Sequence, residues 1–179
     1  MPLMYDLGAG LKGASGAMKQ RGWDVVTLDI DPKFGCDITA DVRSWHYSAA
    51  GRRPDLLWFS MPCDEFSREF MPWCRTGNTP DLSLVLACLR IRDEMQPHNW
   101  LCENVRGAIE YFRPIMGPYI YHAGPFFLWG KCPPIGGVNM RSFRKKESYG
   151  SGEPEKRAMI PYNLSVAVAV AVEQQAYLI

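Results

Sequence analysis

The sequence lacks the features that mark membrane, secreted and zinc-binding proteins. It has no apolar run long enough to cross a bilayer and no amino-terminal signal peptide. Its six cysteines include no Cys-x-x-Cys pair and no cluster with histidine at zinc-site spacing. The net charge of +1 is too small to indicate a nucleic-acid partner by itself. We therefore expect a cytoplasmic protein with reduced thiols and with neither a metal nor a membrane partner.

What is present suits one globular domain. Hydrophobic residues make up 47% of the 179 residues and charged residues 22%, which is ordinary for a soluble protein. The length allows a single full core. Short apolar segments alternate with helix-like segments, and this alternation predicts an α/β fold. We expect one domain over residues 1–179.

A glycine-rich turn lies near the start of the chain. Residues 6–13 are Asp-Leu-Gly-Ala-Gly-Leu-Lys-Gly, with glycines at 8, 10 and 13, between a short apolar lead and a predicted helix over 14–21. Glycine lets the backbone approach a ligand closely, and the following helix start favours an anionic group. Glycine-rich turns are common, so this motif alone is weak evidence.

An acidic residue follows the glycine turn at a meaningful distance. The predicted second strand, 24–28, ends at Asp29, roughly 20 residues beyond the glycines, where an acid accepts hydrogen bonds from ribose hydroxyls. The alternative, a turn or helix-capping aspartate, suits Asp31 before Pro32 better than it suits Asp29. The glycine turn and Asp29 together predict a nucleoside-bearing cofactor.

Cys63 follows the most apolar of the predicted strands. Residues 56–59 are Leu-Leu-Trp-Phe, and the run stops at Ser60-Met-Pro62. A thiol at the carboxyl end of a central strand lies where an open α/β sheet places its chemistry, although a free cysteine is more often a small buried apolar residue. Residues 60–78 are expected to form a long functional loop, and Thr79-Pro80 to begin a helix that runs to about Met95.

A second candidate residue ends another predicted strand. Residues 99–102 run directly into Glu103, which is a surface residue in most such settings. If this strand ends beside the strand before Cys63, the thiol and the carboxyl group meet in one cleft. Further along, residues 119–121 and 126–129 predict a hairpin, 133–155 a polar loop and 162–175 a helix.

In this order and spacing, the chain resembles the cytosine carbon-5 DNA methyltransferases in four segments, residues 6–13, Asp29, residues 62–67 (Pro-Cys-Asp-Glu-Phe-Ser) and residues 103–105 (Glu-Asn-Val). Residues 157–164 resemble the ending of short, phage-type members. The resemblance implies a Rossmann-like S-adenosylmethionine-dependent methyltransferase fold, a mixed and mostly parallel sheet flanked by helices. It also implies DNA as partner, with the cytosine flipped out or single-stranded, in the cytoplasm of a bacterium or a phage-infected host.

The resemblance assigns roles to individual residues. It makes Cys63 the nucleophile that adds to cytosine carbon-6, and Glu103 the residue that holds the base and protonates it. It implies contacts to S-adenosyl-L-methionine from Asp6, Gly8, Ala9, Gly10, Gly13, Asp29, Ile30, Asp41, Val42, Ser60 and Pro62. The expected substrate contacts are Ser67, Arg68, Asn104, Arg106, Arg141, Arg144 and Lys145, although a basic run such as 141–146 is usually a solvated loop.

The chain also departs from the family pattern. Met61 and Asp64 flank Pro62-Cys63, where the family has proline and glutamine. No Gln-x-Arg-x-Arg signature is evident, and the segment between Pro133 and Arg157 is too short for a target-recognition domain. We therefore expect a short or relaxed target sequence. Two alternatives stay open, namely the same chemistry on RNA, a free cytidine nucleotide or a modified cytosine, and a non-catalytic cofactor- or nucleic-acid-binding module.

Overall fold

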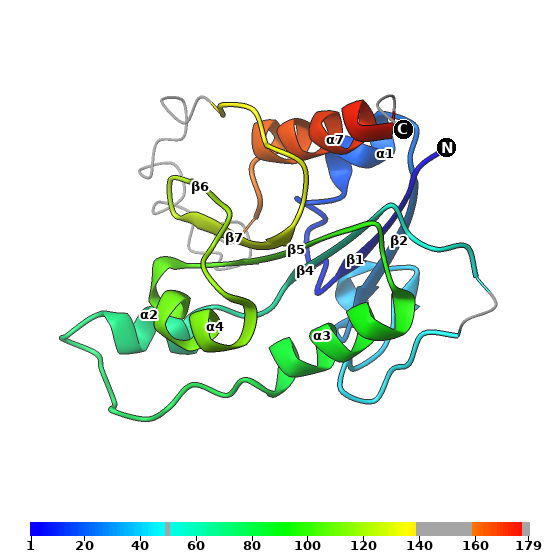
Figure 1. Ribbon diagram of the computed structural model, residues 1–179. Coiled ribbons are helices and arrows are strands. Elements are labelled where there is room, and N and C mark those ends of the chain that lie inside the picture. The colour runs from blue at the N-terminus through cyan, green and yellow to red at the C-terminus, as the bar shows by residue number, and fades with distance from the viewer. Residues whose placement is uncertain (49–50, 139–158, 177–179) are drawn as a thin grey trace.

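The protein is built around one seven-stranded sheet with helices on both faces (Figure 1). The computed structural model describes residues 1–48, 51–138 and 159–176. Its strand order is β3-β2-β1-β4-β5-β7-β6. The strands are β1 (Leu3–Leu7), β2 (Asp24–Asp29), β3 (Ile38–Thr39), β4 (Leu56–Ser60), β5 (Asn99–Asn104), β6 (Tyr121–Ala123) and β7 (Phe126–Lys131).

The five strands from β3 to β5 are parallel to one another, and the hairpin β6–β7 completes the sheet. Strand β7 pairs antiparallel with β5, so it lies between β5 and β6. Strands β1 and β4 are central. The four side chains from Leu56 to Phe59 have no exposed area, which explains the continuous apolar run of β4, because a central parallel strand is covered on both faces.

Two helical layers cover the sheet. One face carries α2 (Asp64–Phe70), α3 (Ser83–Met95) and α4 (Ile109–Met116), and the other carries α1 (Gly16–Gln20) and α7 (Tyr162–Ala176) (Figure 1). Short 3-10 turns, η1 (Pro32–Phe34) and η2 (Arg106–Ala108), complete the elements. Alternate residues of β4 enter the two layers, Leu57 and Phe59 on one side and Leu56 and Trp58 on the other.

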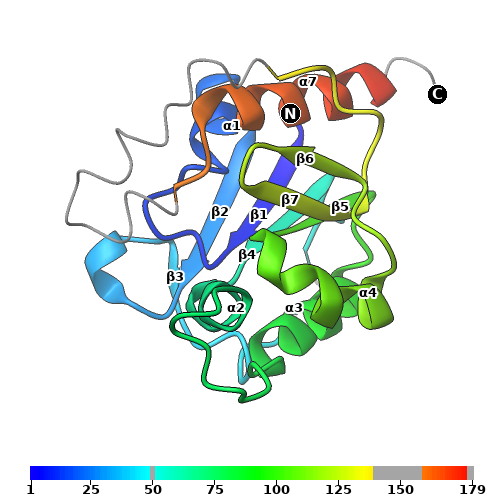
Figure 2. The same cartoon turned by 90° about the vertical axis from the view of Figure 1, so that its left-hand side faces the viewer.

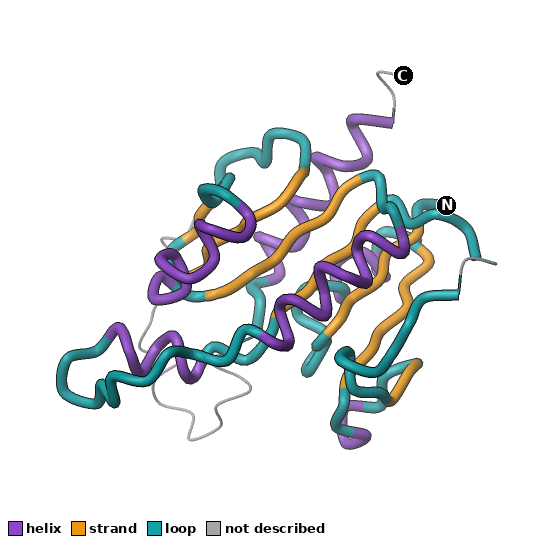
Figure 3. The backbone as a smooth tube through the Cα atoms, turned by 60° about the horizontal axis from the view of Figure 1, so that its bottom comes forward, coloured by secondary structure: helices purple, strands orange, loops and turns teal. Residues whose placement is uncertain are grey.

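The carboxyl ends of the parallel strands form the edge of the sheet that carries the candidate site. Figure 2 looks onto this edge, and Figure 3 shows that α2 and the loop after it stand out beyond the sheet. The site therefore lies at the place where an open parallel sheet leaves room for a ligand between diverging connections.

Several sequence expectations are confirmed. The strands predicted at 24–28, 56–59 and 99–102 are present, each extended by one or two residues. The hairpin near 119–129 and the helix over 162–175 are also present. Residues 164, 165, 168, 169 and 172 of α7 are all buried, and this spacing is helical although the Val-Ala alternation has the period of a strand.

The prediction of a long loop over residues 60–78 is wrong for its first half. Residues Asp64–Phe70 form α2, with Cys63 at its N-cap position and two acidic residues in the first turn. Those negative charges favour a helix start, and Phe66 packs into the core beneath the helix. The helix was missed because only one of its seven residues is a large buried apolar side chain, so its periodicity is weak.

Two helix starts also differ from expectation. Helix α3 begins at Ser83 and not after Thr79, because the Asp81 carboxylate accepts hydrogen bonds from the Ser83 amide and hydroxyl, each at 2.8 Å. Helix α1 is confined to Gly16–Gln20, and residues 11–15 form turns that include Lys12 with φ at 61°. The polar loop expected at 133–155 is described only as far as residue 138.

Candidate active site

The glycine turn after β1 is fastened to the end of β2. The amides of Gly8 and Ala9 both donate to the Leu28 carbonyl, at 2.9 and 3.1 Å. Gly8 has φ at 68°, and a Cβ there would lie 2.8 Å from the Ser60 carbonyl oxygen. Only glycine therefore suits this position. At Gly10, in contrast, an added Cβ would meet nothing within 4 Å, so the backbone there faces open space.

Asp29 organises this turn. Its Oδ2 accepts the Gly10 amide at 2.9 Å, and its Oδ1 accepts the Asp31 amide at 3.0 Å. A carboxylate has about four acceptor positions, so Asp29 keeps acceptors for a ligand hydroxyl. Asp31, as expected, is a capping residue, because its carboxylate accepts the Lys33 amide at the start of η1.

A cavity of about 710 Å³ lies along this edge of the sheet. Its walls come from the glycine turn, the ends of β2, β4 and β5, and the start of α2. All the residues expected to contact the cofactor line it, namely Asp6, Gly8, Ala9, Gly10, Gly13, Asp29, Ile30, Asp41, Val42, Ser60 and Pro62. Cys63, Glu103 and Ser67 line it too.

Other wall residues were missed by sequence reasoning. They are mainly apolar and come from distant parts of the chain, including Phe34, Met71, Leu84, Pro125, Phe126, Met159 and Ile160. No local pattern distinguishes them from core residues. Packing brings them to the cavity from η1, the end of α2, the start of α3, the hairpin turn and the lead into α7.

Asp6 is a buried acid in the cavity wall. Its side chain is 1% exposed, and its Oδ2 has no hydrogen-bond partner among the described residues. Burial raises the pKa of Asp6 to about 6, while the neighbouring Ser15 opposes part of the shift. A buried carboxylate oxygen without a donor fits a ligand that brings an N–H or ammonium group to this wall.

Cys63 lies at the junction of the β4 loop and α2, half-buried in the cavity wall. Burial raises the pKa of its thiol, and the nearby charges of Glu103 and Asp64 raise the pKa further, while Ser67 lowers it. The resting group is therefore a thiol, and a thiolate forms readily only when the negative charge around it is reduced.

Glu103 is the partner that the strand order brings to Cys63. It pairs directly with Ser60 across β4 and β5 and is 7% exposed. Burial raises the pKa of Glu103 to about 8, with the Ser60 hydroxyl opposing part of the shift. That hydroxyl in turn accepts the indole N–H of buried Trp58 at 2.8 Å. At neutral pH Glu103 is therefore mainly a neutral carboxyl group that can donate a proton.

The predicted substrate residues separate into three groups. Ser67 lines the cavity, whereas Arg68 and Arg106 lie outside its lining. Asn104 is buried with its amide committed, because Nδ2 donates to the Met61 carbonyl at 3.1 Å and Oδ1 accepts the Val105 amide at 2.9 Å. Its side chain joins the ends of β4 and β5. Arg141, Arg144 and Lys145 lie outside the described residues.

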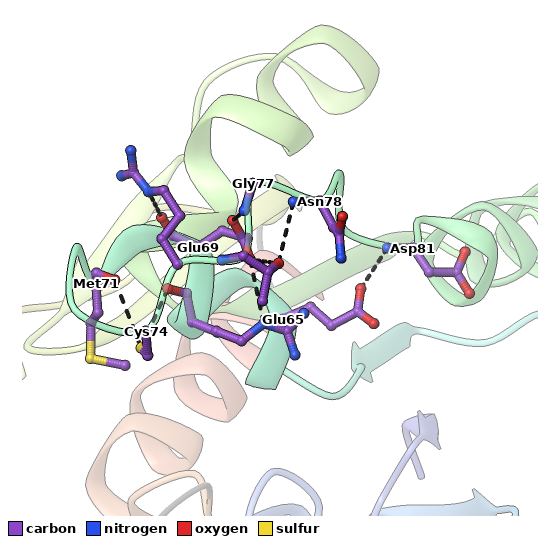
Figure 4. A network of polar contacts seen from close by, with 10 residues as sticks. Glu65, Glu69, Met71, Cys74, Gly77, Asn78 and Asp81 are labelled. Carbon is purple, nitrogen blue, oxygen red and sulfur yellow. Dashed lines mark hydrogen bonds and ion pairs between the residues drawn. The ribbon is translucent and has the colours of Figure 1, made fainter.

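A buried carboxylate holds the loop between α2 and α3 (Figure 4). Glu69, 6% exposed, accepts the amides of Thr76 and Gly77 at 3.0 and 2.9 Å and also the Thr76 hydroxyl. These bonds, the Thr76 hydroxyl first, lower the pKa of Glu69 to about 2. Glu65 accepts the Asp81 amide at 2.6 Å. The loop beside the cavity is thus held by its own helix.

The described residues contain neither a metal-binding cluster nor a membrane-spanning helix. In the described part of the chain, no three side chains of histidine, cysteine, aspartate or glutamate are grouped so as to hold a metal ion. Within the same residues, none of the helices has the length and apolar character that crossing a membrane requires.

Comparison with known proteins identifies the fold. No protein-family model matches the chain, and no curated protein does. An E. coli protein assigned as a DNA modification methyltransferase encoded within prophage Cp matches 73% of this chain and 47% of its own, at 19% identity and a TM-score of 0.52. The Entamoeba histolytica methyltransferase EhMeth matches 76% of this chain and 55% of its own, at 14% identity and a TM-score of 0.55.

The chain therefore spans about half the length of these two solved structures. Three findings define the fold class, namely the mostly parallel seven-stranded sheet, its two helical layers and these structural neighbours. The protein has the Rossmann-like fold of S-adenosylmethionine-dependent methyltransferases.

Proposed function

We propose that this protein transfers a methyl group from S-adenosylmethionine to carbon-5 of cytosine in DNA through a covalent adduct with Cys63. The observation that carries the proposal is that Cys63 and Glu103, from the ends of neighbouring strands, line the cavity that the glycine turn also lines. The fold and the methyltransferase neighbours support methyl transfer, and the prophage neighbour supports DNA as the substrate.

The cavity fits the cofactor. The glycine turn leaves open space beside Gly10, Asp29 keeps acceptor positions for ribose hydroxyls, and Asp6 has an unpartnered oxygen for a donor group. Asp41 and Val42 line the part of the wall that we assign to the adenine. When bound, S-adenosylmethionine supplies the methyl group as an electrophile.

The chain's own residues activate the base. The Cys63 thiolate forms a bond to cytosine carbon-6, and the proton of Glu103 passes to N3, so that carbon-5 gains the electron density of an enamine. Neutral Glu103 suits both steps, because an ionised Glu103 raises the pKa of Cys63 and has no proton to give. After methylation, loss of the carbon-5 proton to a base allows the Cys63 thiolate to leave.

The direct test uses methyl-labelled S-adenosylmethionine with DNA, RNA and free dCMP, followed by nucleoside analysis. We expect carbon-5-methylcytosine from DNA and none with Cys63→Ala. Product from RNA or dCMP alone would contradict the DNA assignment, and undiminished transfer by Cys63→Ala would contradict the mechanism.

A trapping experiment separates the enzyme from a binding module. DNA that contains 5-fluorocytosine cannot release the enzyme, because the carbon-5 proton is replaced by fluorine. We expect a stable adduct at Cys63, detected by mass spectrometry of the tryptic peptide. If no cytosine substrate traps the protein or gains a methyl group, the non-catalytic alternative holds.

The second candidate is the same chemistry on RNA, a free cytidine nucleotide or a modified cytosine. It is favoured by the net charge of +1 and by the short segment between Pro133 and Arg157. The three-substrate assay above distinguishes it from the first.

A further inference from the structure

The loop after α2 carries an unusually exposed aromatic pair. Trp73 is 81% exposed and Phe70, the last residue of α2, is 51% exposed, and Met71 between them lines the cavity. Among the described residues, the Trp73 side chain has neither a ring partner nor a hydrogen bond. Large apolar side chains left in water at the rim of a candidate site indicate a binding surface.

The loop presents Trp73 on a fixed support. Residues 71–74 form a tight turn in which the Cys74 amide donates to the Met71 carbonyl at 3.2 Å, and Pro72 restricts the backbone before Trp73. The same loop is tied to Glu69 through the amide of Thr76 and, as Figure 4 shows, through that of Gly77. An exposed ring on such a loop costs little conformational entropy when a ligand covers it.

Positive charge accompanies the aromatic pair. Residues 70–79 contain no aspartate or glutamate, and their only charged side chain is the exposed Arg75. The guanidinium of exposed Arg106 lies over the Phe70 ring at 5.5 Å from its centroid. A guanidinium over one ring, with a second open ring three residues further along the chain, matches the phosphates and bases of a nucleic acid strand.

We propose that Phe70, Trp73, Arg75 and Arg106 form a stacking platform for single-stranded DNA, which holds bases next to the target cytosine. In a duplex both faces of each base are already stacked on neighbouring bases. The exposed Trp73 ring can therefore stack only on an unpaired base, which has a free face. The seven residues of α2 span about 10 Å, about three stacked nucleotides, between Cys63 and Phe70. This inference rests on the proposed function for the identity of the target base.

Binding is tested without chemistry by a cytosine-free oligo-dT strand and fluorescence anisotropy on the full chain. Trp73→Ala should weaken binding by about 5- to 150-fold, the loss typical of one stacked base. Trp73→Tyr should keep most of the affinity, whereas Trp73→Leu should lose as much as Trp73→Ala. Leu86→Ala, which removes another half-exposed apolar side chain, is the matched control and should change nothing.

The charge component is tested by the salt dependence of the same binding. Arg106→Gln should reduce the slope of log Kd against log salt by roughly 0.7, the value for one phosphate contact on a single strand. Trp73→Ala should leave that slope unchanged. Equal affinities of Trp73→Tyr, Trp73→Leu and the unmodified protein would overturn the platform.

The other possible occupants are outcomes of the same design. A duplex that binds as tightly as oligo-dT, with the same loss in Trp73→Ala, would overturn the preference for an unpaired strand. Tighter binding of oligo-U would assign the surface to RNA and overturn the DNA proposal. A dimer in solution that Trp73→Ala dissociates would show that a second copy of the chain covers the rings.

Methyl transfer separates this inference from the proposed function. Trp73→Ala should raise KM for a cytosine-containing single strand and leave kcat unchanged. A loss of kcat with KM unchanged would overturn the platform, because it would place the effect of Trp73 on the active site and not on strand binding. If the unmodified protein methylates no cytosine, the proposed function fails while the oligo-dT binding series still decides the platform.

Discussion

At Glu103, burial and hydrogen bonding act in opposite directions on one carboxyl group. Loss of hydration raises its pKa from the usual 4.5 to about 8, and the Ser60 hydroxyl recovers only part of the shift. Glu103 is therefore a neutral acid at neutral pH, and it lies beside a thiol that must ionise to react. The two groups therefore need to be considered together, because the charge of Glu103 is also a cause of the raised pKa of Cys63.

The pH dependence of activity tests this pair. Activity requires protonated Glu103 and ionised Cys63, and the pKa of Cys63 lies above its ordinary value and therefore above that of Glu103. We expect kcat/KM to rise with pH up to about 8, to stay level while further ionisation of Cys63 offsets the loss of the Glu103 proton, and to fall once Cys63 is fully ionised. Glu103→Gln should lower kcat by about 10²- to 10⁴-fold and abolish the fall at high pH. The check is a pH series of kcat/KM for both proteins, and an alkaline fall that persists in Glu103→Gln would assign it to another group.

At the scale of the element, the turn after β1 depends on one glycine. Gly8→Ala combines a positive φ with a contact to the Ser60 backbone, and we expect it to lower the free energy of unfolding by about 1–3 kcal/mol. Gly16→Ala is the matched control, because its Cβ meets nothing and the site is helical, so it should gain about 0.5–1 kcal/mol. Urea unfolding measures both. Similar losses in the two variants would contradict the steric argument.

The loop between α2 and α3 depends on Glu69. Glu69→Gln removes the carboxylate that several donors share, so we expect faster hydrogen exchange at the amides of Thr76 and Gly77. Because the pKa of Glu69 is lowered, the carboxylate stabilises the fold fully above pH 4.5 and loses this effect as the pH falls towards about 2. Glu110→Gln, on exposed α4 surface, is the control and should not alter exchange in this loop. Unchanged protection in Glu69→Gln would show that other contacts hold the loop.

At the scale of the whole molecule, a ligand in the cavity should stabilise both helical layers at once. The cavity is lined by residues from the start of the chain, from β4 and β5, and from the lead into α7. S-adenosylmethionine at about 100 times its Kd should add about 2.7 kcal/mol to the free energy of unfolding. Asp29→Ala should lose most of this gain, because the turn at Gly10 and the expected ribose contact both depend on its carboxylate.

Thermal unfolding with and without S-adenosylmethionine checks that prediction. Cys63→Ser is the control, since it changes the thiol and leaves the glycine turn intact, and its gain should equal that of the unmodified protein. A gain that Asp29→Ala retains in full would place the cofactor elsewhere in the molecule.

Much of the candidate site follows from local chemistry. The glycine turn, the acid at the end of the second strand and the polar residues that follow two apolar strands depend on steric rules and periods of a few residues. That is why the positions of Asp29, Cys63 and Glu103 could be predicted, and why all the residues that we expect to contact the cofactor line one cavity.

The remaining features depend on packing between distant segments. The register that pairs Ser60 with Glu103, the insertion of β7 beside β5, and the approach of Phe126 and Ile160 to the cavity are long-range outcomes. The neutral state of Glu103 is also a long-range outcome, because it depends on the burial of that side chain. Helix α2 is another, because its apolar periodicity is weak and the packing of Phe66 in the core stabilises it. Local steric preferences act within one turn or strand, whereas burial and strand pairing depend on how the whole chain closes around its sheet.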